Sequence, residues 1–188
     1  MQVIAGYLKG RILKCPKGLA TRPTIGRMKK SIFDICAQEL QGCHFLDIFA
    51  GSGQMGIEAL SRGAAFASFI ENAPPAISCL KSNLETLELT HTAQLLTQPA
   101  QRSLLKLIEQ DVCFDIIYID PPYGTPLTEK TLHQIDNSSL FHPHTRIFLE
   151  ESQNFEDKLD KIELEHIHCT QIRKYGDTKL FEFRQISH

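Results

Sequence analysis

The sequence predicts an α/β fold in which a seven-stranded, mainly parallel sheet ends in an antiparallel hairpin and carries helices on both faces. From residue 44 onward, short β-rich runs alternate with longer helical patterns, which is typical of βαβ units. After residue 151, two β-rich runs flank a turn-rich connection, as in an antiparallel pair. A chain of 188 residues is long enough for one sizeable core and too short for two comfortable domains.

The individual elements follow from the same patterns. A short β-rich or irregular arm spans residues 1–23, and a helix is predicted over residues 24–40 with Thr24 as its N-cap. Parallel strands are predicted over residues 44–49, 66–71, 93–97, 115–119 and 146–150, with helices over residues 54–62, 74–89, 100–110 and 127–136 between them. The hairpin strands are predicted over residues 166–173 and 178–183. We divide the chain into an appendage, residues 1–40, and a main domain, residues 41–188.

The charge is strongly polarised along the chain. Residues 1–30 hold eight basic groups and no acidic one, whereas the remaining residues hold 12 basic and 22 acidic groups. A basic arm on an acidic body is expected where one face meets nucleic-acid phosphates, because each neutralised phosphate releases counterions. The alternative is an arm that only improves solubility.

The six cysteines are scattered, with no Cys-x-x-Cys pair and no Cys/His grouping at metal-ligand spacing. We therefore expect no metal, and thiols kept in a reducing cytoplasm. The chain does not open with a basic segment followed by a long apolar run, and no apolar window reaches the length of a membrane span. The sequence predicts a cytoplasmic protein without a membrane partner.

A glycine-rich turn joins the first predicted strand to the next helix. Within Asp47-Ile48-Phe49-Ala50-Gly51-Ser52-Gly53-Gln54-Met55-Gly56, the first two glycines allow tight backbone geometry and close approach of a ligand. Gly56 allows the helix to pack closely on the sheet. Glu71 ends the next strand, where a carboxylate can accept hydrogen bonds from both ribose hydroxyls. The pattern predicts a nucleoside cofactor at this sheet edge.

Two cofactors fit the glycine spacing. Gly-x-Gly-x-x-Gly is also the dinucleotide fingerprint, so NAD is one alternative. Asp47 lies in the strand four residues before Gly51, where its carboxylate can meet a cationic amino-acid group that NAD lacks. Asp47, the glycine turn and Glu71 together favour S-adenosylmethionine.

The fourth predicted strand ends in Asp120-Pro121-Pro122-Tyr123, at the same sheet edge as the glycine turn. The amino group of a base is a poor nucleophile because its lone pair is delocalised into the ring. The Asp120 carboxylate and the Pro121 carbonyl can accept its two protons, while the prolines restrict the backbone and Tyr123 stacks on the base. These four residues are the predicted catalytic residues of an amino-methyltransferase. A rigid turn that only caps the strand is the alternative.

Five segments carry a family resemblance over nearly the whole chain. They are Ile4-x-Gly6-x-x-Lys9-Gly10-Arg11-x-Leu13, Arg22-Pro23-Thr24-x-x-Arg27-x-Lys29-x-x-x-Phe33, residues 46–64, Asp120 to Tyr123, and Lys174-Tyr175-Gly176-Asp177-Thr178. With these segments the sequence resembles the RsmD family, the bacterial 16S rRNA guanine-N2 methyltransferases, which have the Rossmann-like class I methyltransferase fold. Several amino-methyltransferases share Asp-Pro-Pro-Tyr, so the two N-terminal segments narrow the choice.

The resemblance implies an activity and a set of site residues. The activity is methyl transfer from S-adenosyl-L-methionine to the exocyclic N2 of a guanine in 16S rRNA, within a small ribosomal subunit or its assembly intermediate, by a monomer. The implied cofactor contacts are Asp47, Phe49, Ala50, Gly51, Ser52, Gly53, Glu71, Asn72, Ala100 and Asp120. The implied RNA contacts are Lys9, Arg11, Arg22, Thr24, Arg27 and Lys29. Residues 1–40 then form the RNA-contacting appendage and residues 41–188 the catalytic domain.

Two positions depart from the family pattern. Pro99-Ala100 stands where the family usually has an acidic or amide residue before an alanine, so the contact with the adenine amine is missing or comes from Gln98 or Gln101. Ile25-Gly26 stands where a threonine and an aspartate are common, so the helix start and the local charge balance differ from the family pattern.

The residues alone leave two other functions possible. A DNA adenine or a protein glutamine amide presents a similar conjugated amino group to the same kind of loop. A non-catalytic RNA-binding assembly factor would keep the fold without turnover.

Overall fold

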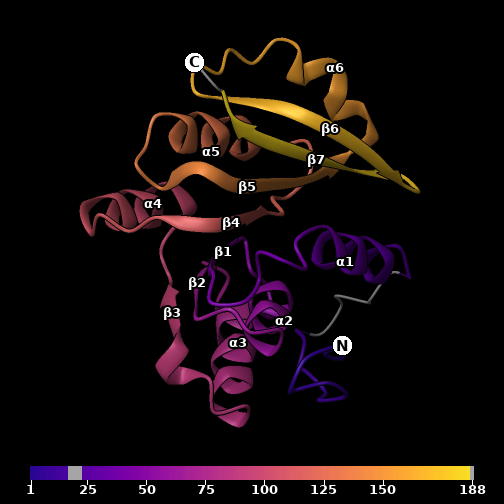
Figure 1. Cartoon of the computed structure of the whole chain (residues 1–188), viewed down its shortest axis with the longest axis vertical. Coiled ribbons are helices and arrows are strands. Elements are labelled where there is room, and N and C mark those ends of the chain that lie inside the picture. Colours follow the sequence, from indigo (N-terminus) through magenta and orange to yellow (C-terminus); the bar gives the residue numbers. More distant parts are fainter. Residues whose placement is uncertain (17–22, 187–188) are drawn as a thin grey trace.

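The fold is a single seven-stranded sheet with helices on both faces, seen in a computed structural model that describes residues 1–16 and 23–186, with only the backbone of residues 23–25 (Figure 1). The strand order is β3-β2-β1-β4-β5-β7-β6. The strands are β1 (His44–Ile48), β2 (Phe66–Ile70), β3 (Ala93–Leu96), β4 (Phe114–Ile119), β5 (Phe141–Ser152), β6 (Ile167–Tyr175) and β7 (Thr178–Gln185). Strands β1 to β5 pair in parallel, whereas β7 pairs antiparallel with both β5 and β6. The predicted Rossmann-like class I methyltransferase fold is confirmed.

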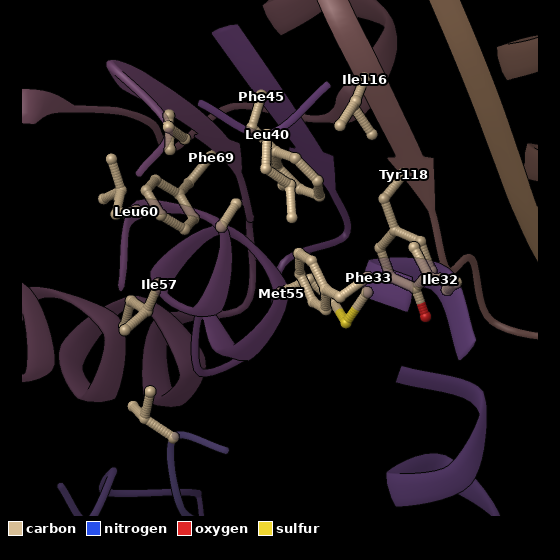
Figure 2. Close-up of a cluster of buried hydrophobic side chains, with 14 of the residues drawn as sticks. Ile32, Phe33, Leu40, Phe45, Met55, Ile57, Leu60, Phe69, Ile116 and Tyr118 are labelled. Atoms are coloured by element: carbon tan, nitrogen blue, oxygen red, sulfur yellow. The ribbon is translucent and has the colours of Figure 1, made fainter. Parts of the chain in front are cut away.

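The helices lie on two faces because the strand residues alternate between them. Phe45 and Phe69 point into a core with α1 (Pro23–Ile35), α2 (Gln54–Ser61) and α3 (Pro74–Thr86). Leu46 and Ile48 point the other way, into a core with α4 (Ala100–Glu109) and α5 (Leu127–Asp136). Figure 2 shows the first core, where aromatic strand residues meet side chains from α1 and α2. Asp47 follows Phe45 by two residues, so it faces the α1–α2 side.

Three short elements complete the chain and were not predicted. They are the 3-10 helices η1 (Thr90–Thr92) and η2 (Gln153–Phe155), and the short helix α6 (Glu156–Leu159). Within the described residues, no helix is long and apolar enough to cross a membrane.

The predicted boundaries of the first helix were wrong. The helix begins at Pro23, so Thr24 is its second residue and not its N-cap. Pro is favoured at this first position, because its fixed φ suits a helix and its missing N–H has no helical partner there. The helix ends at Ile35 and not at residue 40, because the amides of Ala37 and Glu39 bond to carbonyls three residues back rather than four.

Strand β5 is longer than the predicted range of residues 146–150. Its first half contains His142-Pro143-His144, which does not look like a strand in the sequence. The register with β4 is irregular between Phe114 and Ile116, and the Thr145 hydroxyl donates to the Phe114 carbonyl at 2.7 Å. A proline is tolerated at such an irregularity, because the ladder does not need its missing N–H there.

The N-terminal arm, residues 1–16, is docked on α2. The amides of Ile4 and Ala5 donate to the Glu58 carboxylate at 2.8 and 2.9 Å, and the Tyr7 amide donates to the Ser61 carbonyl at 2.9 Å. Gly6 makes this approach possible, since a Cβ there would lie 1.7 Å from the Ser61 carbonyl oxygen. The arm therefore packs on the main domain, and the proposed boundary at residue 40 stays a prediction.

Candidate active site

The candidate site lies where the order of the sheet reverses. Strand β1 has β2 on one side and β4 on the other, and open parallel sheets bind ligands beyond the carboxyl ends of such strands. The Asp120 amide donates to the Ile48 carbonyl at 3.2 Å, so the Asp-Pro-Pro-Tyr segment begins beside the glycine turn. A cavity of about 450 Å³ is lined by residues of both segments.

The glycine turn adopts the tight geometry that its sequence predicts. Gly51 and Gly53 have φ values of 57° and 80°, in the left-handed region. A Cβ on Gly51 would meet nothing within 4 Å, whereas one on Gly53 would lie 2.2 Å from Leu80 Cδ1. Gly53 is thus needed for packing, while Gly51 leaves room at the cavity. The non-glycine Phe49 is also left-handed, with φ 65°, a strained conformation of a kind that often occurs at functional sites.

Asp47 is almost fully buried, and its side chain caps the N-terminal turn of helix α2. Its Oδ2 accepts a hydrogen bond from the Gly56 amide at 2.9 Å. Burial raises the pKa of Asp47 to about 7, although the Gly56 amide favours the charged form. In a dinucleotide site the pyrophosphate occupies such a helix N-terminus. A carboxylate already bonded there would repel it, which favours a ligand that brings a cation.

Glu71 is held rigidly at the end of β2. Its Oε2 accepts from the Gly51 amide at 2.8 Å, and its Oε1 accepts from the amides of Asn72 and Ala73 at 2.8 and 2.7 Å. The carboxylate therefore ties the glycine turn to the next strand while lining the cavity. The two amides occupy both lone pairs of Oε1, whereas Oε2 keeps one lone pair and can still accept a ligand hydroxyl.

Carboxylates crowd the other half of the cavity. Burial raises the pKa of Asp120 well above its usual value, and the negative charges of Glu150, Asp47 and Glu151 act in the same direction. Glu150 accepts hydrogen bonds from the Tyr118 hydroxyl at 2.5 Å and from the Tyr123 hydroxyl at 2.7 Å.

Glu150 received no role from the sequence, and the structure places it in the cavity wall. The only signal in the sequence was its place at the end of the predicted strand over residues 146–150, and the pairing of that strand with β4 is seen only in the structure. Ile119 pairs with Leu149, so the next residues, Asp120 and Glu150, lie beside each other at the carboxyl ends of parallel strands.

Most of the predicted cofactor residues line the cavity. The exceptions are Gly53 and Ala100; Ala100 is buried in the α4–α5 core at the start of α4. Of the predicted catalytic residues, Asp120, Pro121 and Pro122 line the cavity, whereas Tyr123 lies outside its wall with 40% of its surface exposed. The lining residues that the sequence assigned neither to the cofactor nor to catalysis are Met1, Lys29, Gln54, Met55, Ala73, Ala76, Tyr118 and Glu150, of which Lys29 was predicted as an RNA contact.

Lys29 is buried, whereas a residue that contacts RNA must be exposed at the surface. Its side chain is 1% exposed and its Nζ is 2.7 Å from Glu58 Oε2, so RNA cannot reach it in this structure. Three and four residues further along the helix, Ile32 and Phe33 share its buried face. Lys29 is therefore removed from the predicted RNA contacts.

The structure describes the side chains of only some of the other predicted RNA contacts. Lys9, Arg11 and Arg27 are exposed, and Arg11 reaches the Thr86 carbonyl at 3.5 Å. Arg22 and the side chain of Thr24 lie outside the described residues. The RNA role of all of them stays a prediction. In the part of the chain that the structure describes, no group of three or more His, Cys, Asp or Glu side chains could hold a metal ion.

The model of the family described as "Conserved hypothetical protein 95" matches residues 1–184. The chain belongs to this family. "Ribosomal RNA small subunit methyltransferase D" of Escherichia coli is 31% identical over 150 residues, covering 80% of this chain and 74% of that protein. The resemblance to the RsmD family is thereby confirmed.

Further relatives of this RsmD-family protein agree in sequence and fold. YlbH of Bacillus subtilis is 40% identical over 156 residues, covering 83% of this chain and 85% of YlbH. The solved structure of yhhF from Escherichia coli superimposes with a TM-score of 0.84 at 25% identity, covering 100% of this chain and 99% of yhhF.

Proposed function

We propose that this protein transfers a methyl group from S-adenosylmethionine to the exocyclic N2 of a guanine in small-subunit rRNA. The single observation that carries the proposal is the cavity shared by the glycine turn and Asp120-Pro121-Pro122. A cofactor pocket and an amine-binding loop on one cavity are what an amino-methyltransferase requires. The relatives named as small-subunit rRNA methyltransferases support the choice of RNA.

The donor half of the cavity fits S-adenosylmethionine. Glu71 Oε2 offers a free lone pair for a ribose hydroxyl, Asp47 offers a buried carboxylate for an ammonium group, and Gly51 leaves open space at the wall. When bound, the cofactor supplies an electrophilic methyl group on a positively charged sulfur. That positive charge would lower the raised pKa of Asp120 and favour its ionised form.

The acceptor half orients the amine. The ionised Asp120 carboxylate and the Pro121 carbonyl accept hydrogen bonds from the amino group, which directs its lone pair toward the methyl group. When the amine takes the methyl group and the sulfur keeps the bonding electrons, the Asp120 carboxylate would accept the surplus proton of the amine or pass it to water. Tyr123 provides a partly exposed ring on which the guanine stacks.

Asp120→Ala is the direct test. We expect methyl transfer to undermodified small subunits to fall by about 100- to 10,000-fold. S-adenosylhomocysteine should still bind, because Asp47, the glycine turn and Glu71 are intact. Side-by-side assays on RNA, DNA and protein, followed by mass analysis of the modified nucleoside, identify the substrate. Transfer only to DNA or protein, or tight binding of NAD and none of S-adenosylmethionine, would contradict the proposal.

A further inference from the structure

The cavity wall contains a buried cation that neither the methyl transfer nor the RNA contact uses. Lys29 lines the cavity from α1, on the same side of the sheet as Asp47. An ammonium group carries three N–H donors, and among the described residues Glu58 is its only partner. Donors are therefore left for a further acceptor.

Two cations share the Glu58 carboxylate. Its Oε2 meets Lys29 Nζ at 2.7 Å and its Oε1 meets Arg62 Nε at 2.9 Å, while the amides of Ile4 and Ala5 also donate to it. One carboxylate is thus shared by two cations and two amides. Burial lowers the pKa of Lys29, although the negative charges of Glu58 and Asp47 favour its charged form. A carboxylate bound in the cavity beside Lys29 would favour this charged form further.

A second polar group of the cavity wall also lacks a partner. Ser52 lies in the glycine turn and lines the cavity, and its buried Oγ has no hydrogen-bond partner within residues 1–16 and 23–186. Buried polar groups are normally satisfied, and an exception often marks the place of a ligand or water. A cation and a hydroxyl donor in one wall suit a carboxylate.

We propose that Lys29 Nζ and Ser52 Oγ bind the α-carboxylate of S-adenosylmethionine, while Asp47 binds its α-ammonium group. The inference rests on the proposed function, since it assigns the amino-acid end of that cofactor. The zwitterionic end matches the wall in sign, with its carboxylate toward Lys29 and its ammonium toward Asp47. The Gly56 amide donates to Asp47 Oδ2, and no described residue donates to Oδ1, which can therefore accept the ammonium group.

Calorimetry with two ligands isolates the carboxylate. S-adenosylmethionine and its decarboxylated form differ only in that group, so the ratio of their affinities measures its contribution. We expect the wild-type protein to prefer S-adenosylmethionine by about 10- to 100-fold. Lys29→Met should bring the ratio close to one by weakening only S-adenosylmethionine. Lys30→Met, an exposed change at the next position of α1, should keep the wild-type ratio.

Ser52→Ala protects the test against misfolding of the Lys29 variant. It leaves the Glu58 cluster intact and should reduce the ratio by about 2- to 10-fold. A ratio that is unchanged in Lys29→Met or in Ser52→Ala, or a wild-type protein without preference, overturns the inference. If the wild-type protein binds neither ligand, the proposed function itself fails.

Discussion

The Tyr123 hydroxyl donates a hydrogen bond to Glu150 Oε1 at 2.7 Å, across 27 residues of sequence. The bond joins the last residue of Asp-Pro-Pro-Tyr to the end of the neighbouring strand β5. Glu150 also accepts a hydrogen bond from the buried Tyr118 hydroxyl on β4, so a second bond holds its carboxylate in place. A ring with 40% of its surface exposed is thereby held in one orientation, next in sequence to Pro122 of the cavity wall.

Removing only this hydroxyl should impair the use of RNA and not of the cofactor. In Tyr123→Phe the ring remains but loses a hydrogen bond to a charged group, and we expect kcat/KM for the ribosomal substrate to fall by about tenfold. Tyr123→Ala also loses stacking and should lower it by about a further tenfold. Steady-state methylation and calorimetry with S-adenosylhomocysteine measure the two effects.

Tyr175→Phe is the matched control, because it removes the same atom from a tyrosine that bonds to Ser31 away from the cavity. Wild-type kinetics in Tyr123→Phe would show that the bond to Glu150 has no positioning role.

Methyl transfer should depend on pH through Asp120. Because burial and neighbouring carboxylates raise the pKa of Asp120, activity should decline on acidification at a higher pH than an ordinary Asp would give. Glu150→Gln removes one of these negative charges, which favours the ionised form and lowers the pKa of Asp120. The acidic limb of the kcat/KM profile should therefore move to lower pH. Identical limbs in the two proteins would mean that another group controls the profile.

Gly56 is required for the packing of α2 on the sheet. A Cβ there would lie 2.3 Å from Phe69 Cε1, so Gly56→Ala should lower the free energy of unfolding by about 1–3 kcal/mol through overpacking. Gly26→Ala is the control, since a Cβ in that helical position meets nothing within 4 Å. It should stabilise the protein by about 0.5–1 kcal/mol. Urea unfolding measures both, and equal destabilisation by the two changes would argue against close packing at Gly56.

The exposed basic residues of the arm should act through phosphates. Lys9→Ala and Arg11→Ala should each weaken RNA binding and reduce the slope of log K against log salt by about 0.7 to 0.9 for each lost phosphate contact. Lys106→Ala, an exposed change on α4 at the other face of the sheet, should leave the slope unchanged. If all three variants show the wild-type slope, the arm does not meet RNA.

Local patterns in the sequence determined the sheet, most of its helices and the two motifs of the site. A buried strand, a glycine turn and the start of a helix are adjacent in sequence, so residues 46–60 specify their own conformation. The parallel order of the strands then places Asp47 and Asp120 at one edge without further information.

Only the tertiary structure decided which side chains face the cavity from elsewhere. Lys29 belongs to a basic segment, and its burial follows from how α1 packs on α2, which local periodicity does not encode. Glu150 reaches Tyr123 because β5 lies next to β4. Contacts between residues far apart in sequence depend on strand order and helix docking. The positions of Glu150 and Lys29 in the cavity wall are therefore seen only in the folded chain.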